Sequence, residues 1–122
     1  MNSSQAVGQL GEKTAEKFLK KNGYKILHRN WRARYAELDI VALKNKIVIF
    51  VEVKTMRQGG KLRPEDNVDY FKQKKLLQSA KLYLVHNKIK PDMPWQIDVV
   101  AITIGDNDEI VKLNHLTNAV FE

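Results

Sequence analysis

The spacing of apolar residues predicts a helix at the start of the chain. Across residues 7–19 apolar side chains recur at steps of three and four, which places them on one face of a helix. The pair Asn22-Gly23 ends this segment, because glycine readily takes the left-handed conformation of a C-terminal cap. We therefore expect a first helix that packs one face against the rest of the protein.

Three predicted strands follow this helix. Apolar runs at 24–31, 35–43 and 47–55 have the length of strands, and the last two are rich in Val and Ile. Only Lys44-Asn45-Lys46 separates these last two runs, which predicts a hairpin. Consecutive strands joined so tightly pair antiparallel.

The second half of the chain predicts a loop, a long helix and a strand. Residues 56–65 contain two glycines and a proline, which is typical of a loop. Asp66 is a suitable N-cap for a helix that ends before Pro91, and residues 95–104 alternate as a strand does. A short strand at 109–113 is also expected. The order α-β-β-β-α-β predicts an α/β domain over residues 1–122, with a mixed central sheet and a helix on each side.

Composition supports a single folded domain and excludes several kinds of site. The 122 residues are 43% hydrophobic and 29% charged, as in folded proteins rather than disordered ones. Cysteine is absent, so disulfides, Cys-ligated zinc, iron–sulfur clusters and thiol nucleophiles are excluded. Any metal ion must bind oxygen or nitrogen.

The net charge suggests a polyanionic partner. Lys and Arg total 21 against 14 Asp and Glu, which gives +7 and a pI near 9.6. Nucleic acid is the first expectation and an anionic membrane surface the second. Residues 1–13 lack the apolar stretch of a signal peptide, and no apolar run approaches the roughly 20 residues needed to span a bilayer. We therefore expect a cytoplasmic protein without membrane segments.

Four charged residues interrupt the predicted hairpin. If Asn45-Lys46 is a two-residue loop, Asp39 lies opposite Glu52, and Glu37 lies opposite Lys54. Two carboxylates roughly 5 Å apart repel each other unless they share a cation or a proton. A hard divalent ion such as Mg²⁺ fits this need.

These residues resemble a known signature. Asp39 followed by Glu52-Val53-Lys54 resembles the D…(D/E)-x-K motif of the restriction-endonuclease-like, or PD-(D/E)XK, nucleases. A longer pattern resembles the bacterial YraN-type family, whose nuclease assignment rests on similarity to archaeal Holliday-junction resolvases. The residues that carry it include Gly11-Glu12, Asn30-Trp31-Arg32, Glu37-Leu38-Asp39, 50–55, Lys72-Gln73 and Asp98-Val99.

The resemblance implies a restriction-endonuclease-like fold and metal-dependent hydrolysis of DNA phosphodiesters, including branched DNA. Asp39, Glu52 and the Val53 carbonyl would bind Mg²⁺ or Mn²⁺, with Glu12 as an auxiliary ligand. Lys54 would orient water or neutralise the transition state, and Glu37 would hold Lys54 or a second ion. Gln73 and Asp98 would support the pocket. The expected nucleic-acid contacts are Arg29, Trp31, Arg32, Arg34, Lys61, Arg63 and Lys72.

Other interpretations stay open at this point. The strand charges can be ordinary ion pairs on an exposed face, and Gln73 and Asp98 can be satisfied polar residues of the core. The whole chain can be a nucleic-acid-binding module that does not cut, or a small protein-interaction adaptor. A homodimer is attractive for a nuclease because paired cuts on a two-fold substrate need two sites.

Overall fold

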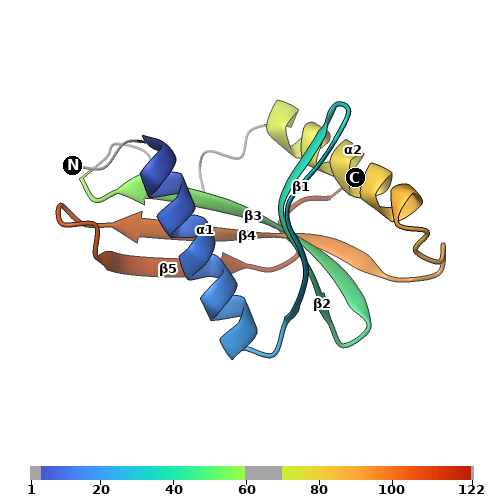
Figure 1. Ribbon diagram of the computed structural model, residues 1–122, viewed down its shortest axis with the longest axis horizontal. Coiled ribbons are helices and arrows are strands. Elements are labelled where there is room, and N and C mark those ends of the chain that lie inside the picture. Colours follow the sequence, from blue (N-terminus) through green and yellow to red (C-terminus); the bar gives the residue numbers. More distant parts are fainter. Residues whose placement is uncertain (1–3, 60–69, 122) are drawn as a thin grey trace.

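The computed structural model describes residues 4–59 and 70–121, and within them a five-stranded sheet lies between two helices (Figure 1). The prediction of a mixed α/β sheet flanked by helices is confirmed. The elements in chain order are α1 (Ser4–Lys21), β1 (Lys25–Ala33), β2 (Ala36–Lys44), β3 (Ile47–Arg57), α2 (Tyr70–His86), β4 (Trp95–Ile104) and β5 (Ile110–Leu116).

The strands lie in the sheet in the same order as in the sequence. β3 and β4 are parallel, whereas the other neighbouring pairs are antiparallel. The predicted hairpin is present, and β3, α2 and β4 form a crossover between two parallel strands. α2 lies in that crossover, so the segment that follows β3 returns across the sheet before β4 begins.

The end of α1 has a local cause that fits the sequence. Gly23 has φ of 86°, and its amide donates to the carbonyl of Lys20 while the amide of Tyr24 donates to that of Leu19. These two bonds satisfy carbonyls at the end of α1, as in a Schellman cap.

Neither α1 nor α2, the helices of the described ranges, is long and apolar enough to cross a membrane.

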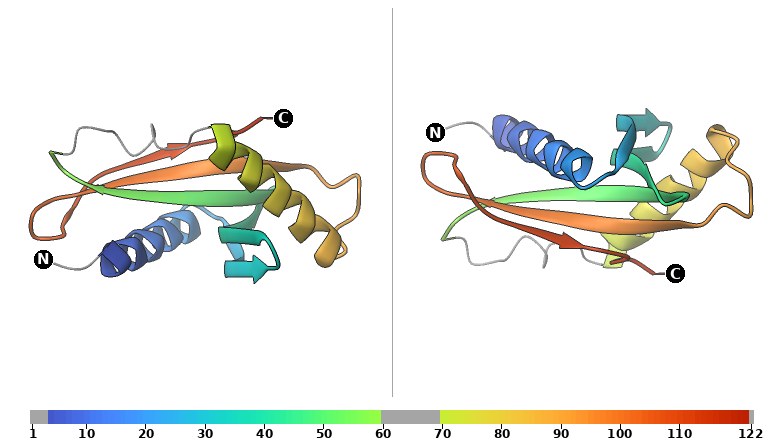
Figure 2. Two further views of the ribbon diagram at one scale, coloured as in Figure 1. Left: turned by 90° about the horizontal axis from the view of Figure 1, so that it is seen from above. Right: turned by 90° about the horizontal axis from the view of Figure 1, so that it is seen from below.

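The two faces of the sheet carry separate apolar clusters. Figure 2 shows α1 along one side of β3 and β4, with α2 crossing obliquely at the other end of the sheet. On β3, Val48 and Phe50 pack in the cluster that contains α2, and Ile49 and Val51 pack in the cluster that contains α1. Because side chains alternate along a strand, Glu52 continues the face of Phe50 and points toward α2.

The β2–β3 hairpin has the predicted loop and register, but its ladder is shorter than predicted. Asn45 and Lys46 both have positive φ, as a two-residue type I′ turn requires. Pairing then runs from Lys44 with Ile47 to Ile40 with Val51, where it stops. The predicted backbone pairing of Asp39 with Glu52 and of Glu37 with Lys54 is therefore wrong.

The ladder ends because the first residues of β2 turn away from β3. Glu37 pairs with Arg32 of β1, and the Glu37 amide donates to Ser79 Oγ of α2 at 3.2 Å. β3 meanwhile continues beside β4 as far as Arg57. The two strands thus separate beyond Ile40, and the edge of β3 that faces β2 loses its main-chain partner there.

Candidate active site

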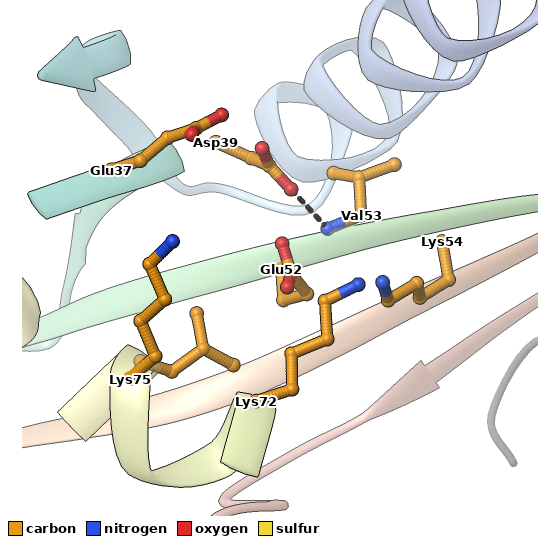
Figure 3. Close-up of a pocket in the computed structure, with 8 residues that line it drawn as sticks. Glu37, Asp39, Glu52, Val53, Lys54, Lys72 and Lys75 are labelled. Carbon is orange, nitrogen blue, oxygen red and sulfur yellow. Dashed lines mark hydrogen bonds between the residues drawn. The ribbon is translucent and has the colours of Figure 1, made fainter. Parts of the chain in front are cut away.

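A pocket opens where β2 separates from β3. Asp39 comes from β2, Glu52 and Lys54 from β3, and two lysines from the first turns of α2 (Figure 3). The fold therefore brings the predicted acids and the predicted lysine into one place, although the backbone pairing differs. The lining residues are Glu37, Asp39, Glu52, Val53, Lys54, Lys72, Lys75 and Leu76.

Asp39 takes over the place that a backbone partner would occupy. The Val53 amide donates to Asp39 Oδ2 at 2.9 Å. The amides of Val48 and Gln58 donate toward β4 and its flanking residues, so the odd-numbered amides of β3 face β2. In an extended strand the amide and carbonyl of one residue point the same way, and the Val53 carbonyl therefore faces the gap beside Asp39.

Glu52 is the most perturbed acid of the pocket. Its side chain is only 9% exposed. Burial raises the pKa of Glu52 to about 9, helped by a hydrogen bond with the Asp39 carboxyl and by repulsion from its charge, while attraction to Lys72 opposes the rise. The raised pKa favours the protonated form of Glu52 in the metal-free pocket. A cation placed between Glu52 and Asp39 would remove the need for that proton.

Three lysines surround the paired acids. Figure 3 shows the ammonium groups of Lys54 and Lys72 close together near Glu52, with Lys75 reaching in from the next turn of α2. α2 contains no Asp or Glu to neutralise its lysines. The pocket therefore pairs a site for a cation with positive groups that can hold a phosphate.

Lys75 was not predicted from the sequence. The signal was present, since Lys72 and Lys75 are three residues apart and share a face once the segment is a helix. The sequence gives no indication of which face of α2 lies over the hairpin, because apolar and basic residues alternate closely there. The packing of Leu76 and Tyr83 on the sheet decides it.

Comparison with known proteins identifies the family. The model of "Uncharacterised protein family UPF0102" matches residues 11–102. The chain belongs to the UPF0102 family. A UPF0102 protein of Thermotoga maritima is 46% identical over 92 residues, covering 75% of this chain and 82% of that protein. A UPF0102 protein of Caldanaerobacter subterraneus is 34% identical over 118 residues, which is 96% of each chain. A UPF0102 protein of Alkaliphilus oremlandii is 37% identical over 113 residues, covering 93% of this chain and 96% of that protein. The YraN-type assignment is thereby confirmed.

The donor set of this UPF0102 pocket suits a hard cation with open positions. Within residues 4–59 and 70–121, no three His, Cys, Asp or Glu side chains gather as ligands of one ion. Asp39 and Glu52 supply two carboxylates, and the Val53 carbonyl adds a third oxygen. Mg²⁺ commonly binds through one or two carboxylates and keeps water or substrate phosphate in its other positions. The residues present fit such an ion.

Glu12 lies on the α1 side of Asp39. It lines a second cleft with Asp39, while Glu52 lies in the pocket under α2. Burial raises the pKa of Glu12, as does repulsion from Asp39, and a hydrogen bond with the Asn30 side chain lowers it. Glu12 is thus a charged neighbour of Asp39 from the other face, and it does not complete a three-acid group within the described residues.

Glu37 and the three predicted arginine contacts each have a partner within the protein. Glu37 lines the pocket with its side chain 55% exposed, 3.8 Å from Arg32. Arg29 pairs with Glu16 at 3.2 Å, and Arg34 lies over the Tyr35 ring. All three arginines are exposed and available to a phosphate. The predicted contacts Lys61 and Arg63 lie outside the described residues.

Trp31, a predicted nucleic-acid contact, packs against α2. Its ring packs edge-on against Tyr83 at 5.2 Å and His86 at 5.8 Å between centroids. It is half-buried and belongs to the cluster under α2. The indole therefore helps to seat α2 on the sheet, and this packing leaves less of its surface for a nucleotide.

Asp98 and Gln73 lie apart from the pocket lining. The Asp98 side chain is fully buried and accepts hydrogen bonds from Gln96 Nε2, His115 Nε2 and the Asn118 amide, each at 2.8 Å. These bonds tie β4 to β5 and the C-terminal segment. Gln73 is half-buried on α2, one turn before Leu77. The placement of Asp98 favours the alternative of a satisfied core residue.

We expect Asp98→Ala to destabilise the protein without altering the pocket. Three donors would lose their acceptor in a buried place, which costs on the order of 3 kcal/mol. Urea unfolding followed by circular dichroism measures this loss, and divalent-ion binding by the folded variant should match that of the wild type. A variant that folds as stably as the wild type but no longer binds the ion would instead place Asp98 in the site.

Proposed function

We propose that this UPF0102 protein is a divalent-metal-dependent nuclease that hydrolyses phosphodiester bonds of DNA. The main support is the geometry of the pocket, in which the buried Glu52 carboxyl and Asp39 line one lysine-rich cavity that opens to the surface. The five-stranded mixed sheet with these acids on β2 and β3 is also what a restriction-endonuclease-like fold requires. The net charge of +7 and the exposed arginines support a polyanionic substrate.

Each side chain of the pocket has a distinct role in the proposed reaction. Asp39 and Glu52, with the Val53 carbonyl, would hold the ion. When bound, the ion would neutralise negative charge on the phosphate and lower the pKa of a bound water. Asp39 is kept in place by the Val53 amide. Lys54 would offer a positive charge beside the reacting phosphate, and Lys72 and Lys75 would bind the neighbouring backbone.

A cleavage assay tests the proposal. The purified protein is incubated with labelled linear, flapped and four-way DNA, with Mg²⁺, with Mn²⁺ and with EDTA. We expect products only with a divalent ion, and a variant of a metal ligand prepared in parallel identifies any contaminating nuclease. Lys54→Met should bind DNA as the wild type does within about threefold, because one phosphate contact among several is lost, but should not cut it.

The alternative is a nucleic-acid-binding module that keeps the fold and does not cut. It would bind DNA equally well with metal and with EDTA and leave every substrate intact. Salt-dependent binding without any product across these substrates would establish the module and reject the nuclease.

A further inference from the structure

The tip of the β1–β2 hairpin presents an exposed aromatic ring in an unfavourable backbone conformation. Tyr35 is 80% exposed and has φ of 63°. Figure 1 shows the turn of this hairpin at the upper margin of the molecule, beyond the level of β3. Among the described residues, Tyr35 is the one aromatic residue with positive φ.

Stability alone does not account for tyrosine at this position. The left-handed region costs an ordinary residue roughly 1–2 kcal/mol, and Gly or Asn takes it more easily. A ring that is 80% exposed regains little of this by burial. Its neighbour Arg34 lies 5.2 Å from the ring centroid, an interaction that is weak at exposed sites. The ring is thus held out toward solvent with a guanidinium on one side.

The surroundings of the tip favour a nucleic-acid partner. Arg32 is 71% exposed on the same hairpin, and Arg34 is exposed as well. Two residues beyond Tyr35, Glu37 already lines the pocket. A chain of nucleotides whose phosphate lies in the pocket would therefore meet both arginines and the ring along this hairpin.

We propose that Tyr35 stacks on an unpaired base of the nucleic acid that occupies the pocket. This inference rests on the nucleic-acid partner of the proposed function. In a duplex the base faces are covered by their neighbours except at the two end pairs, so along the duplex a protruding ring finds a free face only where a base is unpaired. The tip thus gives the protein a preference for DNA that contains unpaired nucleotides, with Arg32 and Arg34 on the adjoining phosphates.

Binding measured without cleavage tests the proposal. Fluorescence anisotropy in EDTA compares a blunt duplex, the same duplex with a single-stranded tail, and the single strand, at one salt concentration. Tyr35→Asn suits the left-handed turn but lacks the ring, so it should weaken binding to the tailed and single-stranded DNA by roughly 5- to 100-fold. Binding to the blunt duplex should change less than about twofold. Tyr35→Phe keeps the ring and should bind as the wild type does.

Thermal melting separates a binding role from a structural one. Tyr35→Asn should melt at the wild-type temperature or above it, because the strain is relieved and little packing is lost. A clear fall in melting temperature, or equal affinity of wild type and Tyr35→Asn for every DNA, would overturn the proposal. A variant with a changed oligomeric state and unchanged DNA affinity would also overturn it, because the tip would then be an interface between copies. A wild type that binds no DNA would overturn it as well.

The outcome is separable from that of the nuclease proposal. Tyr35-dependent binding in a protein that never cuts would support the stacking role and reject the nuclease. Metal-dependent cleavage with no effect of Tyr35→Asn on binding would support the nuclease and reject the stacking role.

Discussion

Replacing Asp39 by asparagine is expected to reduce metal-dependent DNA cleavage on the order of a thousandfold. An asparagine oxygen can still accept the hydrogen bond of the Val53 amide, so the local backbone should keep its position. The negative charge that holds the ion is lost, however, and the neutral amide also offers a poorer ligand. Single-turnover cleavage with saturating protein measures the chemical step apart from DNA binding.

The matched control for this variant is Asp106→Asn. Asp106 is an exposed aspartate outside the pocket, so the same chemical change there should leave cleavage as in the wild type. DNA affinity in EDTA should survive in both variants. An Asp39→Asn protein that cuts as fast as the control would contradict the assigned role of Asp39.

Replacing Glu52 by glutamine is expected to stabilise the metal-free protein while it abolishes cleavage. The glutamine amide can donate to Asp39 as the protonated Glu52 does, but it has no proton to lose. With a folded-state pKa of about 9 against the ordinary 4.5, the folded wild type holds a proton that the unfolded chain has released. Wild-type stability therefore falls as pH rises from about 4.5 to about 9. At pH 7 the variant should gain on the order of 2–3 kcal/mol.

Urea unfolding at a series of pH values checks this effect. The stability difference between Glu52→Gln and the wild type should be small at pH 5 and should grow up to about pH 9. Glu37→Gln serves as the control, because it makes the same chemical change at a side chain that is 55% exposed. A Glu52→Gln protein that is less stable than the wild type at pH 8 would show that the carboxyl is ionised and paired in the metal-free fold.

The local features of the fold were predictable because short-range rules determine them. The loop Asn45-Lys46 fixed the register of β2 and β3 through Ile40, and Gly23 marked the end of α1. The strand-helix-strand order required the parallel pairing of β3 and β4. Asp39, Glu52 and Lys54 could be chosen as a group because charges at alternate positions of apolar strands need a partner.

The remaining features depend on packing between distant segments. Beyond Ile40, where the ladder stops, the Glu37 amide donates to Ser79 Oγ of α2, a contact between residues 42 positions apart. The same docking brings Lys75 over the hairpin. It also encloses Trp31, a predicted nucleic-acid contact, against Tyr83, whereas Tyr35, which the sequence did not single out, is 80% exposed. No local pattern predicts these outcomes, because each depends on where α2 lies on the sheet.

Titration of the protein with Mn²⁺ by isothermal calorimetry measures whether Asp39 and Glu52 together hold a divalent ion, on which the proposed nuclease depends. We predict saturable binding by the wild type with one ion per chain, retained in Asp106→Asn and lost in both Asp39→Asn and Glu52→Gln. Binding that is unchanged in those two variants, or absent from a folded wild type at millimolar Mn²⁺, would contradict the account.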